Sequence, residues 1–145
     1  MAERTVLYRR DENLGIITLN RPDRLNAINR DLLADLRSQL EAARQDEKTT
    51  AVVLAGAGKA FCAGEDLKET SAGKSLEEWT QEADGLQEIQ RRILKLGKPL
   101  IAAIQGYAVG GGCEFAMSCD IRVAGKDAKL GFPETGLGMT VTTAG

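Results

Sequence analysis

The sequence predicts an α/β fold in which some strands pair in parallel. Short apolar runs with strand character alternate with longer segments in which apolar residues recur every three or four positions. Turn-forming residues separate these segments. The chain has 145 residues, 43% hydrophobic and 28% charged, which suits a globular protein with a real core in one domain.

The first segment predicts a β-hairpin. Thr5 to Tyr8 and Gly15 to Leu19 are rich in β-forming residues, and the turn residues Asp11-Glu12-Asn13 lie between them. Asn29 is a good helix N-cap, and a helix follows that ends near Gln45 to Lys48. Its apolar residues have helical spacing: Leu32, Leu33, Leu36, Leu40 and Ala43.

The middle of the chain predicts a strand and a second helix. Ala51 to Ala55 is a continuous apolar run, as expected of a strand covered on both faces. Ser75 and Glu78 form a capping box that begins a helix, and Gly97 with Pro99 ends it. One apolar face of this helix is predicted to comprise Leu76, Trp79, Ala83, Leu86, Ile89, Ile93 and Leu96.

The last third predicts two strands around a glycine turn. The strand Leu100 to Ile104 leads to Gly110-Gly111-Gly112, which opens a short helix carrying Glu114. A second strand, Ile121 to Ala124, leads to a loop that presents Glu134 behind Pro133.

Composition excludes several classes of function. The chain has no histidine, which rules out Ser-His-Asp and Cys-His catalysis and His-containing zinc sites. Its net charge of −2, without a basic face, argues against nucleic-acid binding. Cys62, Cys113 and Cys119 form no C-x-x-C pair and are predicted to be buried thiols in a reducing compartment.

The sequence shows no targeting signal, and we therefore expect a cytoplasmic protein. The charged N-terminal stretch has no apolar signal-peptide region, and no apolar run approaches the ~20 residues that span a bilayer. A mitochondrial matrix protein without its transit peptide has the same appearance.

Two nucleotide-binding motifs fail on inspection. A P-loop at Gly58-Lys59 would need glycine where Val53 stands and Ser or Thr where Ala60 stands. A dinucleotide fingerprint starting at Gly110 would need glycine where Phe115 stands.

The surviving candidates are backbone donors and two carboxylates. The glycine turn exposes N–H groups at a helix start, where the helix dipole favours negative charge. Phe61 to Leu67 follows a buried strand and could supply a second backbone donor. Glu114 lies in an otherwise apolar run, where a carboxylate without a purpose is costly. If Glu114 and Glu134 share a pocket, one can act as an acid and the other as a base.

These motifs together resemble the enoyl-CoA hydratase/isomerase (crotonase) superfamily. The resemblance runs from the first hairpin to the last residue and rests on several motifs in the right order. They are Asn20-Arg21-Pro22, Leu25-Asn26-Ala27, residues 61–68 (FCAGEDLK), residues 98–114 (KPLIAAIQGYAVGGGCE), residues 119–124 (CDIRVA), Phe132-Pro133-Glu134 and residues 136–138 (GLG).

The resemblance implies a fold, a substrate class and a mechanism. It implies a crotonase-like spiral of repeated ββα units that acts on acyl-CoA thioesters. The backbone N–H groups of Glu65 and Gly111 would form the oxyanion hole. Glu114 would activate water and Glu134 would supply the α-proton. Because isomerases of this family generally rely on the Glu134-type residue alone, the presence of both glutamates favours an enoyl-CoA hydratase.

The resemblance also implies a substrate-binding surface and an assembly. The CoA site would be lined by two segments and the glycine turn, through Arg24, Leu25, Ala27, Ala63, Gly64, Asp66, Leu67, Lys68 and Gly110. No metal or redox cofactor is implied, since coenzyme A is part of the substrate. Full-length family members form homotrimers or dimers of trimers.

Three departures from the family pattern affect these expectations. Glu65 replaces a common alanine and places an extra carboxylate near the pocket mouth. Gly138 to Gly145 replaces a Pro-Gly-rich sequence that shapes the acyl pocket, which leaves the acyl group open. The family continues past residue 145, so we expect residues 1–145 to be a C-terminally truncated crotonase-like core that lacks the helical region. An isomerase, another crotonase reaction and a non-catalytic CoA-binding form remain alternatives.

Overall fold

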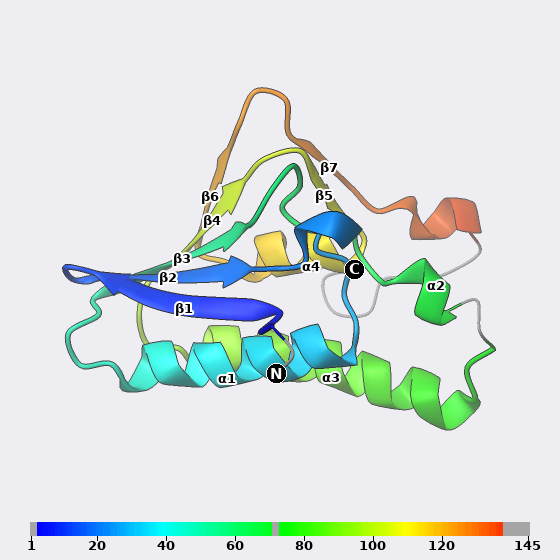
Figure 1. Cartoon of the computed structure of the whole chain (residues 1–145), viewed down its shortest axis with the longest axis horizontal. Coiled ribbons are helices and arrows are strands. Elements are labelled where there is room, and N and C mark those ends of the chain that lie inside the picture. Colours follow the sequence, from blue (N-terminus) through cyan, green and yellow to red (C-terminus); the bar gives the residue numbers. More distant parts are fainter. Residues whose placement is uncertain (1–2, 71–72, 138–145) are drawn as a thin grey trace.

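The computed structural model describes residues 3–70 and 73–137, which fold into a sheet with two long helices packed along one face (Figure 1). The main sheet has five strands, β1 Val6–Asp11, β2 Leu14–Leu19, β3 Ala51–Gly56, β4 Leu100–Ile104 and β6 Ile121–Ala124. They lie in the order β1-β2-β3-β4-β6. The hairpin β1–β2 is antiparallel and every other pair is parallel, which confirms the predicted class.

Two amphipathic helices supply the other half of the core. They are α1 Arg30–Gln45 and α3 Leu76–Leu94. The Asn29 side chain accepts the N–H of Leu32, and Ser75 forms both halves of a capping box with Glu78, so both predicted helix starts are confirmed. Among the described helices, none combines the length and apolar character needed to cross a membrane.

The predicted apolar face of α3 is wrong at its N-terminal end. Leu86, Ile89 and Ile93 are buried, but Leu76 is 83% exposed and Trp79 is 36% exposed. Figure 1 shows that the first turns of α3 extend beyond the start of α1, so α1 does not cover them. Helical spacing therefore identified the face of the helix correctly but not how far the core extends along it.

Strand β3 is fully buried on only one face. Val52 and Leu54 are inaccessible to solvent, whereas Ala51, Val53 and Ala55 are partly exposed. The prediction that both faces would be covered is thus too strong for the described part of the chain. An unbroken apolar run does not distinguish full from partial cover on the second face.

Short elements around the carboxyl ends of the strands complete the fold. A second, two-stranded parallel sheet pairs β5 Tyr107–Val109 with β7 Lys129–Gly131. The helical elements are α2 Leu67–Thr70, α4 Gly111–Ser118 and the 3-10 turns η1 Pro22–Arg24 and η2 Pro133–Leu137. The predicted helix after the glycine turn is confirmed as α4, while β5, β7 and α2 were not predicted.

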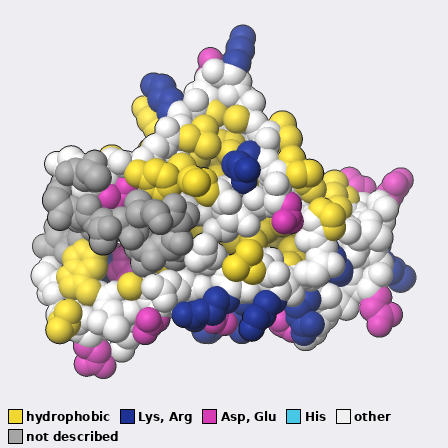
Figure 2. All heavy atoms as spheres, turned by 180° about the vertical axis from the view of Figure 1, so that it is seen from behind, with side chains coloured by type: hydrophobic (Ala, Val, Ile, Leu, Met, Phe, Trp, Pro, Cys, Tyr) yellow, Lys and Arg dark blue, Asp and Glu magenta, His cyan; other side chains and the backbone are white. Residues whose placement is uncertain are grey.

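The face that carries β6 exposes apolar side chains. All four residues of β6 are exposed, with Ile121 at 52% and Val123 at 61%. Met117 on α4, Tyr107 on β5 and Leu130 on β7 are also exposed. Figure 2 shows hydrophobic side chains spread over the back of the molecule. The predicted strand at Ile121 to Ala124 is confirmed, but it is an edge strand in contact with solvent.

Candidate active site

Two segments far apart in the sequence run side by side near the N-terminus of α1. The N–H of Ala63 donates to the carbonyl of Leu25 (3.0 Å) and the N–H of Ile28 donates to the carbonyl of Gly64 (2.7 Å). The N–H of Asp66 then donates back to the carbonyl of Ile28 (2.9 Å). The two segments predicted to line the CoA site are therefore adjacent.

A third segment joins them from the other side. The N–H of Cys62 donates to the carbonyl of Tyr107 (2.9 Å), and the N–H of Val109 donates to the carbonyl of Cys62 (3.1 Å). These bonds place Gly64 against the glycine turn. A Cβ on Gly64 would lie 2.9 Å from the Val109 carbonyl oxygen and 3.6 Å from the Gly111 nitrogen. Glycine at 64, with a φ of +85°, therefore allows the two chains to touch.

The two predicted oxyanion donors are brought together by this contact. Gly111 is the first residue of α4, so its N–H points out of the helix start. Among the described residues, neither the Gly111 N–H nor the Glu65 N–H donates to a backbone carbonyl. Gly112 fixes the helix start, since a Cβ there would lie 2.2 Å from the Cys62 carbonyl oxygen. The structure thus places these two backbone N–H groups near each other, and their role as an oxyanion hole stays a prediction.

Both predicted catalytic carboxylates are buried beside these donors. Glu114, on the first turn of α4, is 1% exposed, and Glu134, in η2, is 6% exposed. Oε1 of Glu134 lies 2.8 Å from the point where a Cβ on Gly110 would be. Oε2 of Glu134 is buried and has no hydrogen-bond partner among the described residues. Such an oxygen is costly unless a ligand or water completes it.

The Glu65 side chain is a third carboxyl in the same space. Its Oε1 and Oε2 lie 3.1 Å and 3.2 Å from the points where Cβ atoms on Gly111 and Gly110 would be. Burial raises the pKa of Glu65, the backbone N–H groups of Glu65 and Gly111 lower it, and the charges of Glu114 and Glu134 raise it further. The expectation of a carboxylate at the pocket mouth is therefore imprecise, because the side chain lies beside the donors.

The predicted CoA-site residues divide into exposed and structural ones. Arg24 and Leu25 at η1 and Leu67 and Lys68 on α2 are exposed, and Ala27 and Ala63 are partly exposed between them. Gly64 and Gly110 are buried in the contact between the loops, with a positive φ at Gly110 (+56°). The structure leaves the exposed members accessible to a ligand along one edge.

Asp66 is placed as an anchor for the loops. It is 9% exposed, and its carboxylate forms an ion pair with Arg21 (3.2 Å). The Arg21 guanidinium also donates to the carbonyl of Ala27. The pair ties the segment before α1 to the segment that carries Glu65.

Asn26 holds the loops in position and was not among the predicted site residues. Its buried amide accepts the N–H of Arg21 (2.8 Å) and donates to the carbonyls of Ala57 and Ala60, each at 2.9 Å. Its positive φ of +56° suits asparagine. Asn26 lies in the motif Leu25-Asn26-Ala27, which could have drawn attention to it, but the motif does not reveal its hydrogen-bond partners.

The cysteines are buried thiols, as predicted. All three are free and buried, and burial raises the pKa of both Cys62 and Cys119 to about 12. Over the described residues, no group of three or more His, Cys, Asp or Glu side chains is arranged to hold a metal ion.

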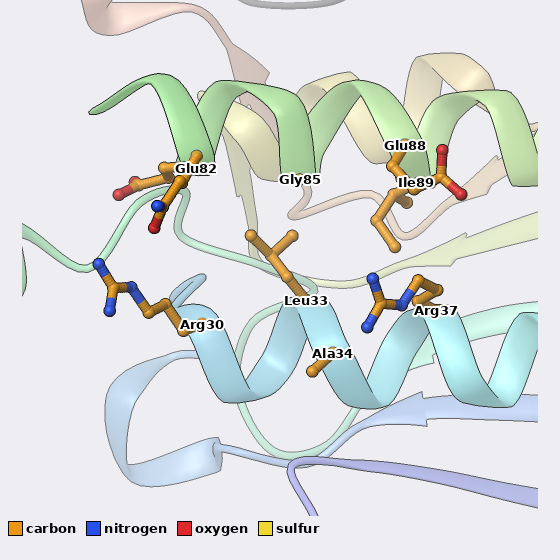
Figure 3. A pocket seen from close by; sticks show the side chains of 9 residues that line it. Arg30, Leu33, Ala34, Arg37, Glu82, Gly85, Glu88 and Ile89 are labelled. Atoms are coloured by element: carbon orange, nitrogen blue, oxygen red, sulfur yellow. The ribbon is translucent and has the colours of Figure 1, made fainter. Parts of the chain in front are cut away.

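A groove of about 400 Å³ lies elsewhere on the molecule, between α1 and α3. Figure 3 shows Arg30, Leu33 and Arg37 of α1 facing Glu82 and Gly85 of α3 across it. None of the predicted site residues lines this groove. The predicted site residues therefore lie away from this groove, in the loops at the glycine turn where the buried carboxylates gather.

Comparison with known proteins connects this geometry to a family. Residues 9–145 match the family model described as enoyl-CoA hydratase/isomerase. The short-chain-enoyl-CoA hydratase of Clostridium acetobutylicum is 42% identical over 136 residues, which are 93% of this chain and 52% of that protein. The crotonyl-CoA hydratase of Syntrophomonas wolfei is 38% identical over 141 residues, 97% of this chain and 54% of that protein.

Solved structures give the same match. The crystal structure of an enoyl-CoA hydratase from Thermoplasma volcanium superimposes with a TM-score of 0.91 at 38% identity, covering 97% of this chain and 56% of that one. The crotonase-like fold predicted from the sequence is thereby confirmed. The chain spans about half the length of the curated relatives it matches.

Proposed function

Because the chain belongs to the enoyl-CoA hydratase/isomerase family, we propose that it serves the hydration of a 2-enoyl-CoA across its 2,3-double bond. The hydratases to which the chain is similar support this reaction. The observation that carries the proposal is the buried Glu134 carboxyl beside the glycine turn: its Oε1 lies against Gly110, and its Oε2 has no hydrogen-bond partner among the described residues. Such an oxygen is suited to act on a reacting atom rather than to stabilise the fold.

The backbone donors stabilise the charge that develops on the substrate. As water adds to C3, electrons move from the double bond onto the thioester oxygen. That oxygen lies between the N–H groups of Glu65 and Gly111. Donors aimed at developing charge are worth about 3 kcal/mol each in comparable sites. Rigid positioning of these donors by Gly64 and Gly112 requires no reorganisation during the reaction.

The two carboxylates move the protons. Glu114 takes a proton from the water molecule while the water oxygen bonds to C3. Protonated Glu134 gives a proton to C2. The product is a 3-hydroxyacyl-CoA, and the sum of the steps is the addition of one water. No metal or redox group takes part in this proposal, and coenzyme A enters only as part of the substrate.

The exposed rim beside the donors is proposed to hold coenzyme A. Arg24 and Lys68 are solvent-exposed cations on the two segments that meet where the N–H of Ala63 donates to the carbonyl of Leu25. Cations placed there complement the phosphates of coenzyme A. Asp66 contributes through its ion pair with Arg21, which keeps the rim in place.

A direct test follows the loss of ultraviolet absorbance when a 2-enoyl-CoA is hydrated. We expect Glu114→Gln and Glu134→Gln each to lower kcat by about 10²–10⁴-fold, the usual contribution of a general acid or base. Glu47→Gln, on an exposed loop after α1, is the matched control and retains full activity. If both site variants hydrate the substrate at the parental rate, the proposal is wrong.

A further inference from the structure

The side chain of Glu65 lies where the substrate's thioester oxygen is expected to bind. Its two carboxyl oxygens reach the edge of Gly110 and Gly111, at the distances given above. The same two N–H groups assigned to the oxyanion hole act on this carboxyl. We propose that the Glu65 carboxyl occupies the oxyanion hole of the substrate-free protein and that a thioester must displace it. This inference rests on the proposed function.

Opposing forces on Glu65 make such displacement feasible. The two N–H groups have no carbonyl partner in the described chain, so a carboxyl oxygen is a favourable acceptor for both. Partial burial of the carboxyl, together with the negative charges that Glu114 and Glu134 carry when they are ionised, disfavours its ionised form there. The residue is only partly buried, so its side chain has a route to solvent. The contact is therefore favourable but readily reversed.

Because its carboxyl occupies the oxyanion hole, Glu65 affects which ligands bind well, thioesters or free coenzyme A. A ligand that needs the oxyanion hole binds only to the fraction of molecules in which Glu65 has moved away, and its apparent affinity falls by that fraction. Free coenzyme A has no thioester carbonyl and does not compete for the hole. Glu65 consequently weakens the binding of thioesters but not the binding of the free thiol.

Calorimetric titration with butyryl-CoA and with free coenzyme A tests this difference. Butyryl-CoA has the thioester but no double bond, so binding is measured without turnover. We expect Glu65→Ala to bind butyryl-CoA roughly ten-fold more tightly than the parent and to bind free coenzyme A equally. Glu69→Ala removes an exposed carboxylate from the same segment and changes neither affinity. Equal affinities of parent and Glu65→Ala for butyryl-CoA would overturn the inference.

A second measurement needs no substrate. The backbone amide signals of Glu65 and Gly111 are followed by NMR as the pH is varied, in the parent and in Glu65→Gln. The other ionisable groups that act on this region are Glu114 and Cys113 on α4, Glu134 in η2 and Cys62, together with the Arg21–Asp66 pair. In the parent, we expect the chemical shifts of both amides to change as Glu65 ionises. In Glu65→Gln, we expect this part of the pH dependence to be lost.

The two measurements separate the possible failures. If the amide titrations of parent and Glu65→Gln coincide, the carboxyl does not occupy the hole and the inference is overturned. If the amides behave as expected but neither protein binds either ligand, the placement of Glu65 is supported and the proposed function fails. A Glu65→Ala protein that does not fold leaves Glu65→Gln as the variant for both experiments.

Discussion

At the scale of single residues, the site is built from groups that would be unfavourable elsewhere in a fold. Glu134 buries an oxygen without a partner in the described chain, and Glu65 carries a carboxyl among like charges. Each arrangement lowers the stability of the folded state. Their concentration around two backbone donors is typical of a functional site rather than of a core.

The cysteine side chains give a prediction at this scale. Cys62 is inaccessible to solvent and burial holds its pKa at about 12, so its thiol stays protonated as the pH rises through the ordinary range near 9. We expect no rapid reaction with a thiol reagent in the native protein between pH 7 and pH 9. In denaturant, all three thiols should react, as counted by absorbance of the released chromophore. A thiol that reacts quickly in the native state would contradict the placement of the cysteines.

Residue types predicted much of the site, but not every contact. An isolated acid in an apolar run indicated Glu114, and the glycine turn indicated backbone donors at residues 110–112, while the choice of Gly111 came from the family resemblance. The direction of the Glu65 side chain could not be predicted, because it depends on two loops that meet only in the folded chain. The same holds for Asn26, whose partners at Ala57 and Ala60 lie more than thirty residues away.

At the scale of elements, the start of α4 depends on close backbone contact. Gly112 lies against Cys62, and Gly64 lies against Val109 and the glycine turn. These contacts hold the start of α4 so that the N–H of Gly111 lies near the N–H of Glu65. The geometry of the oxyanion hole is therefore a consequence of packing between elements.

Substitution of Gly112 tests this packing. A Cβ there would lie 2.2 Å from the Cys62 carbonyl oxygen, which is backbone and cannot rotate away. We expect Gly112→Ala to lower the free energy of unfolding by about 3 kcal/mol, near the upper end for overpacking. Gly131→Ala on β7 is the control, since a Cβ there meets nothing within 4 Å. Urea unfolding measures both, and equal midpoints for the two variants would be inconsistent with the tight contact.

Helices and strands could be predicted where neighbouring residues in the sequence determine them. The hairpin, α1, the start of α3 and β4 follow from caps, periodicity and turn residues. Strands β5 and β7 have three residues each and exist through their mutual pairing, so no local pattern marks them. The exposure of Leu76 and Trp79 depends on the relative lengths of α1 and α3, which periodicity does not report.

At the scale of the whole molecule, the two edges of the main sheet differ. The edge strand β1 ends in charged residues, Arg9, Arg10 and Asp11, which discourage pairing with another chain. The edge strand β6 exposes Ile121 and Val123 beside other apolar side chains. An exposed apolar edge of this kind favours association.

Sedimentation velocity tests this asymmetry. We expect the 145-residue chain to associate in a concentration-dependent way, and Val123→Lys to shift it toward the monomer. Leu7→Lys, at a half-exposed position on β1, is the matched control and should leave the distribution unchanged. A parent chain that remains monomeric at high concentration would contradict the role given to β6. The homotrimer or dimer of trimers implied by the resemblance stays a prediction.

The central claim is that the two backbone donors and two glutamates add water to an enoyl thioester, and mass spectrometry in D₂O tests it most directly. We predict a product that gains one oxygen at C3 and one non-exchangeable deuterium at C2, and a strongly reduced yield of it with Glu134→Gln. A product with a shifted double bond and no added oxygen would indicate isomerisation instead. Unchanged substrate at all enzyme concentrations, or undiminished deuterium transfer without Glu134, would contradict the mechanism.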